Sequence, residues 1–216
     1  SDSVTEQVST LGTDLLTTMV FDDKGHPLKL ADLDQLKSNP AIGQAAPLVQ
    51  TLVTARHGYT EEPATLYGTL PSYGEIHHWQ MRQGRFLKTS DIDNSSYVVV
   101  LSLEAADKFF GQSDPLNETM MLNGRPFTVV GVLEEDTSLM SVMTTSVKIY
   151  TPFTVLTRMS GVRGGISNFI VTPSNPRSMD EAEEALTSFL MRRLKEDDSA
   201  FFIFNQSNLM SVVGTV

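Results

Sequence analysis

The sequence predicts an α+β fold in which both ends of the chain build one α/β layer around a β-rich insertion. Three observations support this. A strand-helix-strand pattern occupies the first part of the chain, a second one closes it, and the residues between them read mainly as short strands and turns. The expected division is 1–61 plus 147–216 for the discontinuous subdomain, and 62–146 for the inserted subdomain.

The first β-α-β unit begins with a Thr/Val-rich strand that ends near Phe21. Leu30, Leu33 and Leu36 then recur at helical spacing, and Asn39-Pro40 ends this short helix. Its start is weakly marked, because a lysine stands where a capping Ser or Thr is expected. An extended region over residues 44–60 predicts one long strand, which completes the unit.

The second unit has the same order and a clearer helix. Residues 166–172 alternate as a strand, and residues 201–204 form the next one. Ser178 and Glu181 have the spacing of a capping box, which predicts the helix start. Because such crossovers are right-handed, the two units are expected to form halves of one layer. The apolar stripe of the helix consists of Ala182, Ala185, Leu186, Phe189, Leu190 and Leu194.

The insertion is most readable over residues 97–134. A short β-branched run at 98–101 predicts a buried strand, and residues 103–110 predict an amphipathic helix that Gly111 ends. A strand at 119–122 then turns back through Asn123-Gly124 into a strand at 126–133. Asn-Gly is a strong hairpin signal, because a type I′ turn needs positive φ at both central positions.

Composition narrows the class of protein. The chain has 216 residues, 40% of them hydrophobic and 19% charged, as in ordinary globular domains. Its net charge of −10 argues against a nucleic-acid or anionic-membrane partner. The absence of cysteine excludes disulfides, thiolate metal sites and a cysteine nucleophile.

The chain contains no run of the roughly 18–20 apolar residues that span a bilayer. It starts with serine and stops within an amphipathic segment. The expectation is a domain cut from a longer membrane protein, and the alternative is a complete protein trimmed of a tag.

A search for chemistry gives no catalytic, cofactor-binding or metal site. The four histidines, His26, His57, His77 and His78, lack the i, i+4 spacing of a helical metal site. Residues 91–95 imitate the start of a calcium loop, but the required glycine and the bidentate glutamate are missing, so a loop with local hydrogen bonds is expected. Nucleophile-elbow and phosphate-loop motifs do not occur.

One stretch is a candidate contact surface. Residues 137–146 read TSLMSVMTTS, a Met/Ser/Thr segment without strong periodicity. Methionine fills cores flexibly, and it also suits adaptable binding surfaces. The second interpretation makes Leu139, Met140 and Met143 possible contacts for a substrate or partner, while the first makes them core residues.

Several motifs together resemble a known family. A strand followed by an amphipathic helix ending in FFG, then DPL and NGRPFTVVGV, is similar to the extracytoplasmic domain of MacB-like ABC transporter permeases, the MacB/FtsX/LolE-like superfamily. LGTDLL near the start and GRF at 84–86 also resemble family motifs. Asn117 and Ser102 depart from the family's glycines, although Asn tolerates a left-handed turn.

The resemblance implies a porter-like subdomain from both ends and an inserted β-rich subdomain. It implies a non-catalytic domain that couples ATP-driven movement to outward transport of peptides, antibiotics or lipoproteins. Expected partners are a second copy of the permease, an ABC ATPase domain and, where one takes part, a membrane-fusion or adaptor protein, but no nucleic acid. Residues 1–10 and 206–216 would be stalk segments.

The implied location is the extracytoplasmic face of the bacterial cytoplasmic membrane, where transmembrane helices tether the domain. The alternative function is a stand-alone extracytoplasmic binding or adaptor module for a peptide or lipid. The two hypotheses differ in whether membrane helices continue beyond both ends of the domain.

Overall fold

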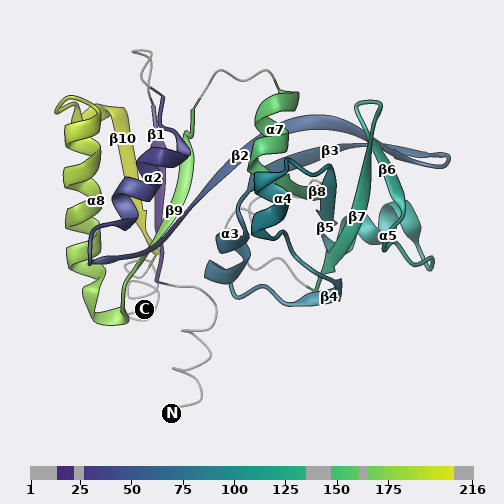
Figure 1. The fold of residues 1–216 in the computed structure, drawn as a ribbon, viewed down its shortest axis with the longest axis horizontal. Helices are drawn as coiled ribbons and strands as arrows, with labels where there is room; N and C mark the ends of the chain where they lie inside the picture. Colours follow the sequence, from purple (N-terminus) through teal and green to yellow (C-terminus); the bar gives the residue numbers. More distant parts are fainter. Residues whose placement is uncertain (1–13, 22–26, 135–146, 161–164, 207–216) are drawn as a thin grey trace, which may run out of the picture. The chain divides into compact units, whose positions relative to one another are not determined.

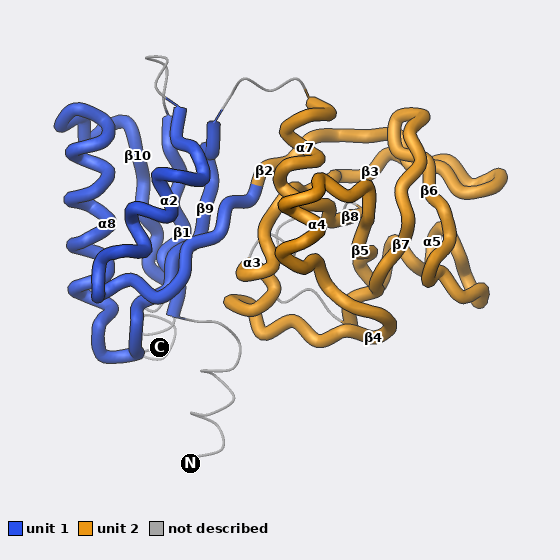
Figure 2. The backbone as a smooth tube through the Cα atoms, in the orientation of Figure 1, with its two compact units in different colours: residues 1–48, 164–216 blue, residues 49–163 orange. Residues whose placement is uncertain are grey.

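The computed structural model describes residues 14–21, 27–134, 147–160 and 165–206. The fold is mixed, rich in sheet and with several helices (Figure 1). It divides into two compact units, unit 1 from residues 1–48 and 164–216, and unit 2 from residues 49–163 (Figure 2). Within the described residues, no helix has the length and apolar character needed to cross a membrane.

In its described residues, unit 1 has a four-stranded sheet and two main helices. Its sheet order is β10-β1-β9-β2, and each neighbouring pair is antiparallel. A strand from the other end of the chain therefore lies between the two strands of each β-α-β unit, which is a split β-α-β arrangement. The elements are β1 (Leu16–Val20), α2 (Leu30–Lys37), the first part of β2 (Ile42–His57), β9 (Asn168–Pro173), η1 (Pro176–Ser178), α8 (Met179–Arg193), η2 (Asp198–Ala200) and β10 (Phe201–Asn205).

Helices α2 and α8 are joined by one arginine. Arg193, the last residue of α8, donates from Nε to Oδ1 of Asp32 at 3.0 Å and from Nη2 to the carbonyl of Pro27 at 3.0 Å. Asp32 also accepts from the backbone N–H of Lys29 at 2.8 Å. This carboxylate therefore caps the start of α2, which the sequence marked only weakly.

The start of α8 differs from the prediction. Ser178 occupies the N-cap position, but its side chain makes no capping hydrogen bond, and its backbone φ and ψ are −98° and 14°. The short helix η1 leads directly into α8, so Ser178 lacks the extended backbone that lets an N-cap side chain reach back to the first turn. The capping box is not formed, although the predicted helix is.

Unit 2 is built on a mixed sheet. The second part of β2 is followed in sheet order by β3, β8, β5, β7 and β4, and β6 pairs with β2 and β7. The pairs β3–β8 and β5–β7 are parallel. The elements are β3 (Thr60–Thr69), α3 (Pro71–Ile76), β4 (Met81–Gly84), α4 (Thr89–Asp93), β5 (Val98–Leu101), α5 (Leu103–Phe110), β6 (Thr119–Leu122), β7 (Arg125–Leu133), β8 (Lys148–Pro152) and α7 (Phe153–Met159).

The predicted strands and helix between residues 98 and 133 are confirmed. Ser102 caps α5 by accepting from the N–H of Ala105 at 3.2 Å, and Gly111 follows the helix with φ 58°. Asn123 and Gly124 have φ 50° and 79°, as the type I′ turn requires. Asn117 adopts φ 65°, so asparagine preserves the left-handed turn.

Two expectations about the middle of the chain differ from the structure. The long strand expected over 44–60 ends at His57, and the chain turns at Gly58, which has φ 60°. The expected boundary at 61/62 falls inside β3, and the one at 146/147 precedes β8. Since β3 pairs with β8 and β8 with β5, these strands belong to unit 2, whose limits are residues 49 and 163.

Candidate functional site

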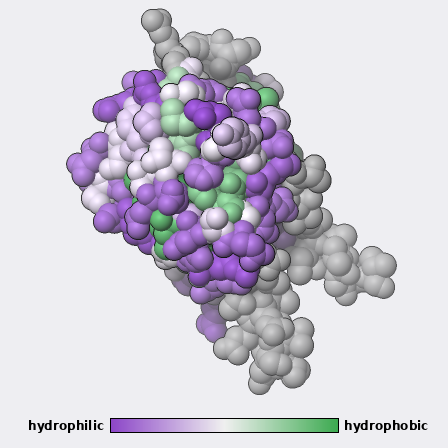
Figure 3. All heavy atoms as spheres, turned by 90° about the vertical axis from the view of Figure 1, so that its right-hand side faces the viewer, coloured by the Kyte–Doolittle hydropathy of each residue, from purple (hydrophilic) through white to green (hydrophobic). Residues whose placement is uncertain are grey.

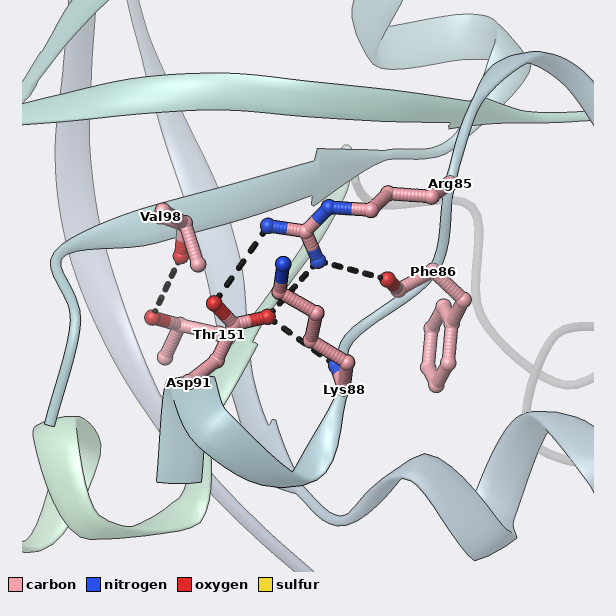
Figure 4. Close-up of polar contacts among 6 residues, drawn as sticks. All are labelled: Arg85, Phe86, Lys88, Asp91, Val98 and Thr151. Carbon is pink, nitrogen blue, oxygen red and sulfur yellow. Dashed lines mark hydrogen bonds and ion pairs between the residues drawn. The ribbon is translucent and has the colours of Figure 1, made fainter. Parts of the chain in front are cut away.

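An ion pair connects the chain after β4 to helix α4 (Figure 4). Arg85 donates from Nη1 to Oδ2 of Asp91 at 2.7 Å and from Nη2 to Oδ1 at 3.3 Å. Nη1 also donates to the carbonyl of Phe86 at 3.0 Å. The Asp91 side chain is 5% exposed and that of Arg85 39%, so the carboxylate is buried under a half-exposed guanidinium.

Asp91 has a second role in the same place. Its Oδ2 accepts from the backbone N–H of Lys88 at 2.9 Å, at the N-terminus of α4. Burial by itself would raise the pKa of the Asp91 carboxyl. The hydrogen bonds from Arg85 and Lys88, together with their positive charges, outweigh burial and lower the pKa below 3.8.

The contacts of Asp91 hold the fold together locally. Both oxygens of Asp91 already accept hydrogen bonds, so the carboxylate stays ionised and occupied. The expectation of a loop over 91–95 is wrong for its first half, because residues 89–93 form α4. The signal that reveals it is an acid three residues after the N-cap, in the position from which it reaches back to the N-cap N–H.

An aromatic cluster lies beside this ion pair in unit 2. Trp79 packs edge-on against Tyr73, Phe86 and Tyr150, with ring centroids 5.0 to 5.5 Å apart. A Cβ on Gly74 would lie 2.9 Å from the Phe86 ring, so glycine permits this close packing. The cluster packs the segment between α3 and α4 against β8.

The histidines do not converge. His57, at the end of β2, lies 3.2 Å from the Thr119 carbonyl through Nδ1 and contacts the Phe110 ring. His77 is buried against Tyr73, whereas His78 is exposed with φ 54°. His26 lies outside the described residues. Among the described residues, no group of three His, Asp or Glu side chains is placed to hold a metal ion.

The candidate contact residues Leu139, Met140 and Met143 lie outside the described residues. Among the described methionines, some lie in or against the core and one is exposed. Met120 is fully buried, and Met159 packs against the same hydrophobic cluster in unit 2. Met19, in unit 1, is 40% exposed.

A hollow of about 320 Å³ lies among the described residues of unit 2, and the sequence did not predict it. Helix α5 and the turn after it supply one wall, and edge strand β4 supplies the other. Figure 3 views the molecule from the end that carries α5 and β6, and shows a mainly hydrophilic surface with small hydrophobic patches. The residues of the hollow come from three separate segments, which is why no single motif indicates it.

Comparison with known proteins gives a consistent family. A family model described as MacB-like periplasmic core domain matches residues 1–189. The macrolide export ATP-binding/permease protein MacB of Aggregatibacter actinomycetemcomitans is 29% identical, over 97% of this chain and 33% of its own length. MacB of Neisseria meningitidis serogroup A is 24% identical, again over 97% of this chain and 33% of its own length. The chain thus spans about a third of these relatives.

Two solved structures share the fold over most of the chain. The periplasmic region of MacB from Actinobacillus actinomycetemcomitans superposes with a TM-score of 0.80 at 25% identity, covering 99% of both chains. The extracellular domain of YknZ, a noncanonic ABC-type transporter from Gram-positive bacteria, has a TM-score of 0.72 at 20% identity. It covers 88% of this chain and 100% of its own, and it shares the fold.

Proposed function

The chain belongs to the family of MacB-like periplasmic core domains, and from this premise we propose that it is the extracytoplasmic domain of a MacB-type ABC transporter permease. In this proposal the domain hydrolyses nothing itself. It relays ATP-driven movement of a dimeric transporter into outward transport of peptides, antibiotics or lipoproteins. An ATPase domain and transmembrane helices would belong to the same protein or its assembly, with an adaptor as a further partner.

The observation that carries the proposal is the similarity over 99% of both chains to the periplasmic region of a MacB protein. The relatives are described as ATP-binding/permease proteins, and this chain corresponds to about a third of their length. ATP binding is therefore assigned to the remaining part.

The hydrogen bonds within each unit are consistent with a domain that transmits force. In unit 1, Arg193 joins the end of α8 to the start of α2, so the two helices are bound to each other over 161 positions of sequence. In unit 2, Asp91 ties the segment after β4 to α4. Connections of this kind let each unit move as a body instead of deforming locally.

Sidedness is tested with a single cysteine in the full-length protein. The chain contains no cysteine, and Tyr59 at the turn between β2 and β3 is fully exposed. We expect Tyr59→Cys to react with a membrane-impermeant maleimide in intact cells whose outer barrier, where present, is permeabilised. Reaction only after the cytoplasmic membrane is broken would contradict the proposal.

Coupling is tested by removing the domain. Replacing it with a short linker in the full-length protein should abolish export of a macrolide and of a test peptide, while purified protein still hydrolyses ATP. Unchanged export would contradict the coupling role. Ester, peptide or phosphate hydrolysis by the isolated chain would contradict its non-catalytic assignment.

The proposed contact of Leu139, Met140 and Met143 with a substrate or partner is tested separately. Changing the three to serine should reduce export without lowering the thermal stability of the isolated chain. A large loss of stability would instead assign them to the core.

A further inference from the structure

The lining of the hollow in unit 2 is mainly polar, with a few buried apolar residues among it. Val132 of β7 and Ala106 of α5 are buried in this lining, together with Pro115. Arg82 of β4 and Asp107 of α5 are exposed on its rim. Every described residue that lines the hollow belongs to unit 2.

A β-bulge places the rim residues of β4. Met81 pairs with Leu133, and Gln83 pairs with Val132. The pairing therefore moves two residues along β4 but only one along β7, so Arg82 is the extra, bulged residue. A bulge on an edge strand redirects side chains that regular alternation would send to opposite faces. Arg82 and Gln83 can therefore both line the hollow, as the structure shows.

The two walls differ in electrostatic sign. Arg82 supplies a guanidinium on the β4 wall. On the opposite wall, Asp107 supplies a carboxylate, and the hollow includes Gly111 to Ser113, directly after the C-terminus of α5. The helix dipole is negative at that end, so it adds to the charge of Asp107. Lys108, the cation of the last turn, is directed to Glu62 at 3.6 Å.

Within the described part of the chain, neither of these two charges is neutralised by a partner. No ion pair or side-chain hydrogen bond there engages Arg82 or Asp107, in contrast to Arg85 and Asp91, which neutralise each other. A free cation and a free anion that line the same hollow, together with the buried residues Val132 and Ala106, complement a ligand with two opposite charges joined by a short body. Guanidinium binds carboxylate in a planar, bidentate geometry, and carboxylate binds ammonium.

We propose that this hollow is a binding site for small zwitterions of dipeptide size, with the ligand's carboxylate at Arg82 and its ammonium group at Asp107. Size supports a dipeptide: a sphere of 320 Å³ is about 8 Å across, and an extended dipeptide spans about 7 Å. The proposal stands on unit 2 alone and does not depend on the transporter assignment.

The test uses the isotope-labelled full chain and the dipeptide alanylleucine as the probe. We expect saturable changes in the amide signals of Gln83 and Gln112 in nuclear magnetic resonance spectra, with a dissociation constant in the millimolar range. Acetylating the amino end or amidating the carboxyl end of the dipeptide should each weaken binding by about tenfold. Absence of saturable shifts at about 20 mM probe would overturn the proposal.

Variants assign each end of the ligand. Arg82→Gln should weaken binding of the free dipeptide, and this variant should bind the free and the amidated dipeptide equally well. Asp107→Asn should bind the free and the acetylated dipeptide equally well. Arg56→Gln on β2 and Glu104→Gln on α5 are the matched controls, since both side chains are exposed and lie outside the hollow. Equal binding by the free and blocked dipeptides, or equal effects of both variants on the losses caused by amidation and acetylation, would overturn the proposal.

Discussion

The two units bury their strands differently. In unit 1, strand β1 alternates, with Leu16, Thr18 and Val20 buried on one face. On the other face Met19 is 40% exposed and its cross-strand partner Phe202 is 53% exposed. In unit 2, every residue of β8 is buried, because the strand is covered on both faces.

The two faces of β8 have different partners. Ile149 pairs with Leu66, and both belong to the hydrophobic cluster that includes Phe109 of α5 and Leu156 of α7. Tyr150 pairs with Tyr67 and faces Trp79 in the aromatic cluster. Unit 2 therefore has a two-sided core, whereas unit 1 depends on one sheet face and on the connection between its helices.

The largest expected effects come from the cores themselves. Phe127 in unit 2 and Phe169 in unit 1 are each 1% exposed, so either change to alanine should lower the free energy of unfolding of its unit by about 3–5 kcal/mol. Trp79, the only tryptophan, reports on unit 2. Its fluorescence transition should shift with Phe127→Ala and stay in place with Phe169→Ala. Equal shifts would mean that the units do not have separate cores.

The next largest loss of stability is expected from breaking the ion pair of unit 2. Asp91→Ala removes both the partner of Arg85 and the cap of α4, so we expect a loss of about 2–3 kcal/mol in the free energy of unfolding, measured by urea denaturation. Asp93→Ala is the matched control, because Asp93 is exposed on the same helix. It should cost about 0.5 kcal/mol or less. Similar losses in both variants would refute the special role of Asp91.

The same carboxylate predicts a pH dependence. Its pKa is lower in the folded protein than the ordinary 3.8, so its stabilising contribution is present above that pH and is lost as the pH falls through the folded value. The stability difference between the native chain and Asp91→Asn should therefore be constant from about pH 7 to 5 and shrink below about pH 4. Chemical denaturation at several pH values measures it. A difference that grows in acid would show that the sign is wrong.

In unit 1, a smaller effect is expected at the helix connection. Arg193→Gln should lower the free energy of unfolding by about 1–2 kcal/mol, because it breaks hydrogen bonds to Asp32 and Pro27 that are only partly buried. Arg192→Gln, at an exposed neighbouring position, should be nearly neutral. Hydrogen exchange at α2 and α8 measures both. Unchanged protection in Arg193→Gln would show that the helices do not depend on this connection.

The smallest effect concerns the capping box that does not form. Ser178→Ala should change the free energy of unfolding by less than about 0.5 kcal/mol, since its side chain makes no capping bond. Thermal unfolding is sufficient to check this. A loss of about 1 kcal/mol, the usual value of an N-cap, would support the sequence-based interpretation against the structure.

The features that the sequence predicted correctly are those that neighbouring residues determine. Asn123-Gly124 fixes a turn by backbone conformation alone, and the apolar stripe of α5 ends at Gly111, so both were readable. The pairing of Arg85 with Asp91 was not, because it depends on a tertiary approach across the end of a strand. The intercalation of strands in unit 1 was also hidden, since it joins residues such as Thr17 and Ile170 from opposite ends of the chain.

The candidate hollow shows the same limit. Arg82 and Asp107 are ordinary surface charges in the sequence, 25 positions apart, and only the pairing of β4 with β7 and the crossover through α5 bring them to one rim. The turn at Gly58 was missed for a related reason: β2 and β3 are both extended, and a single glycine separates them less clearly than Asn-Gly.

The proposed function requires the domain to move with ATP in a dimeric transporter. The most direct measurement is the distance between spin labels on the two copies of the full-length protein, attached at Tyr59→Cys in unit 2 or Glu184→Cys on α8 in unit 1, both exposed positions. The proposed function predicts two different distance distributions for the nucleotide-free and ATP-bound protein at both positions. Identical distributions at both positions would contradict it.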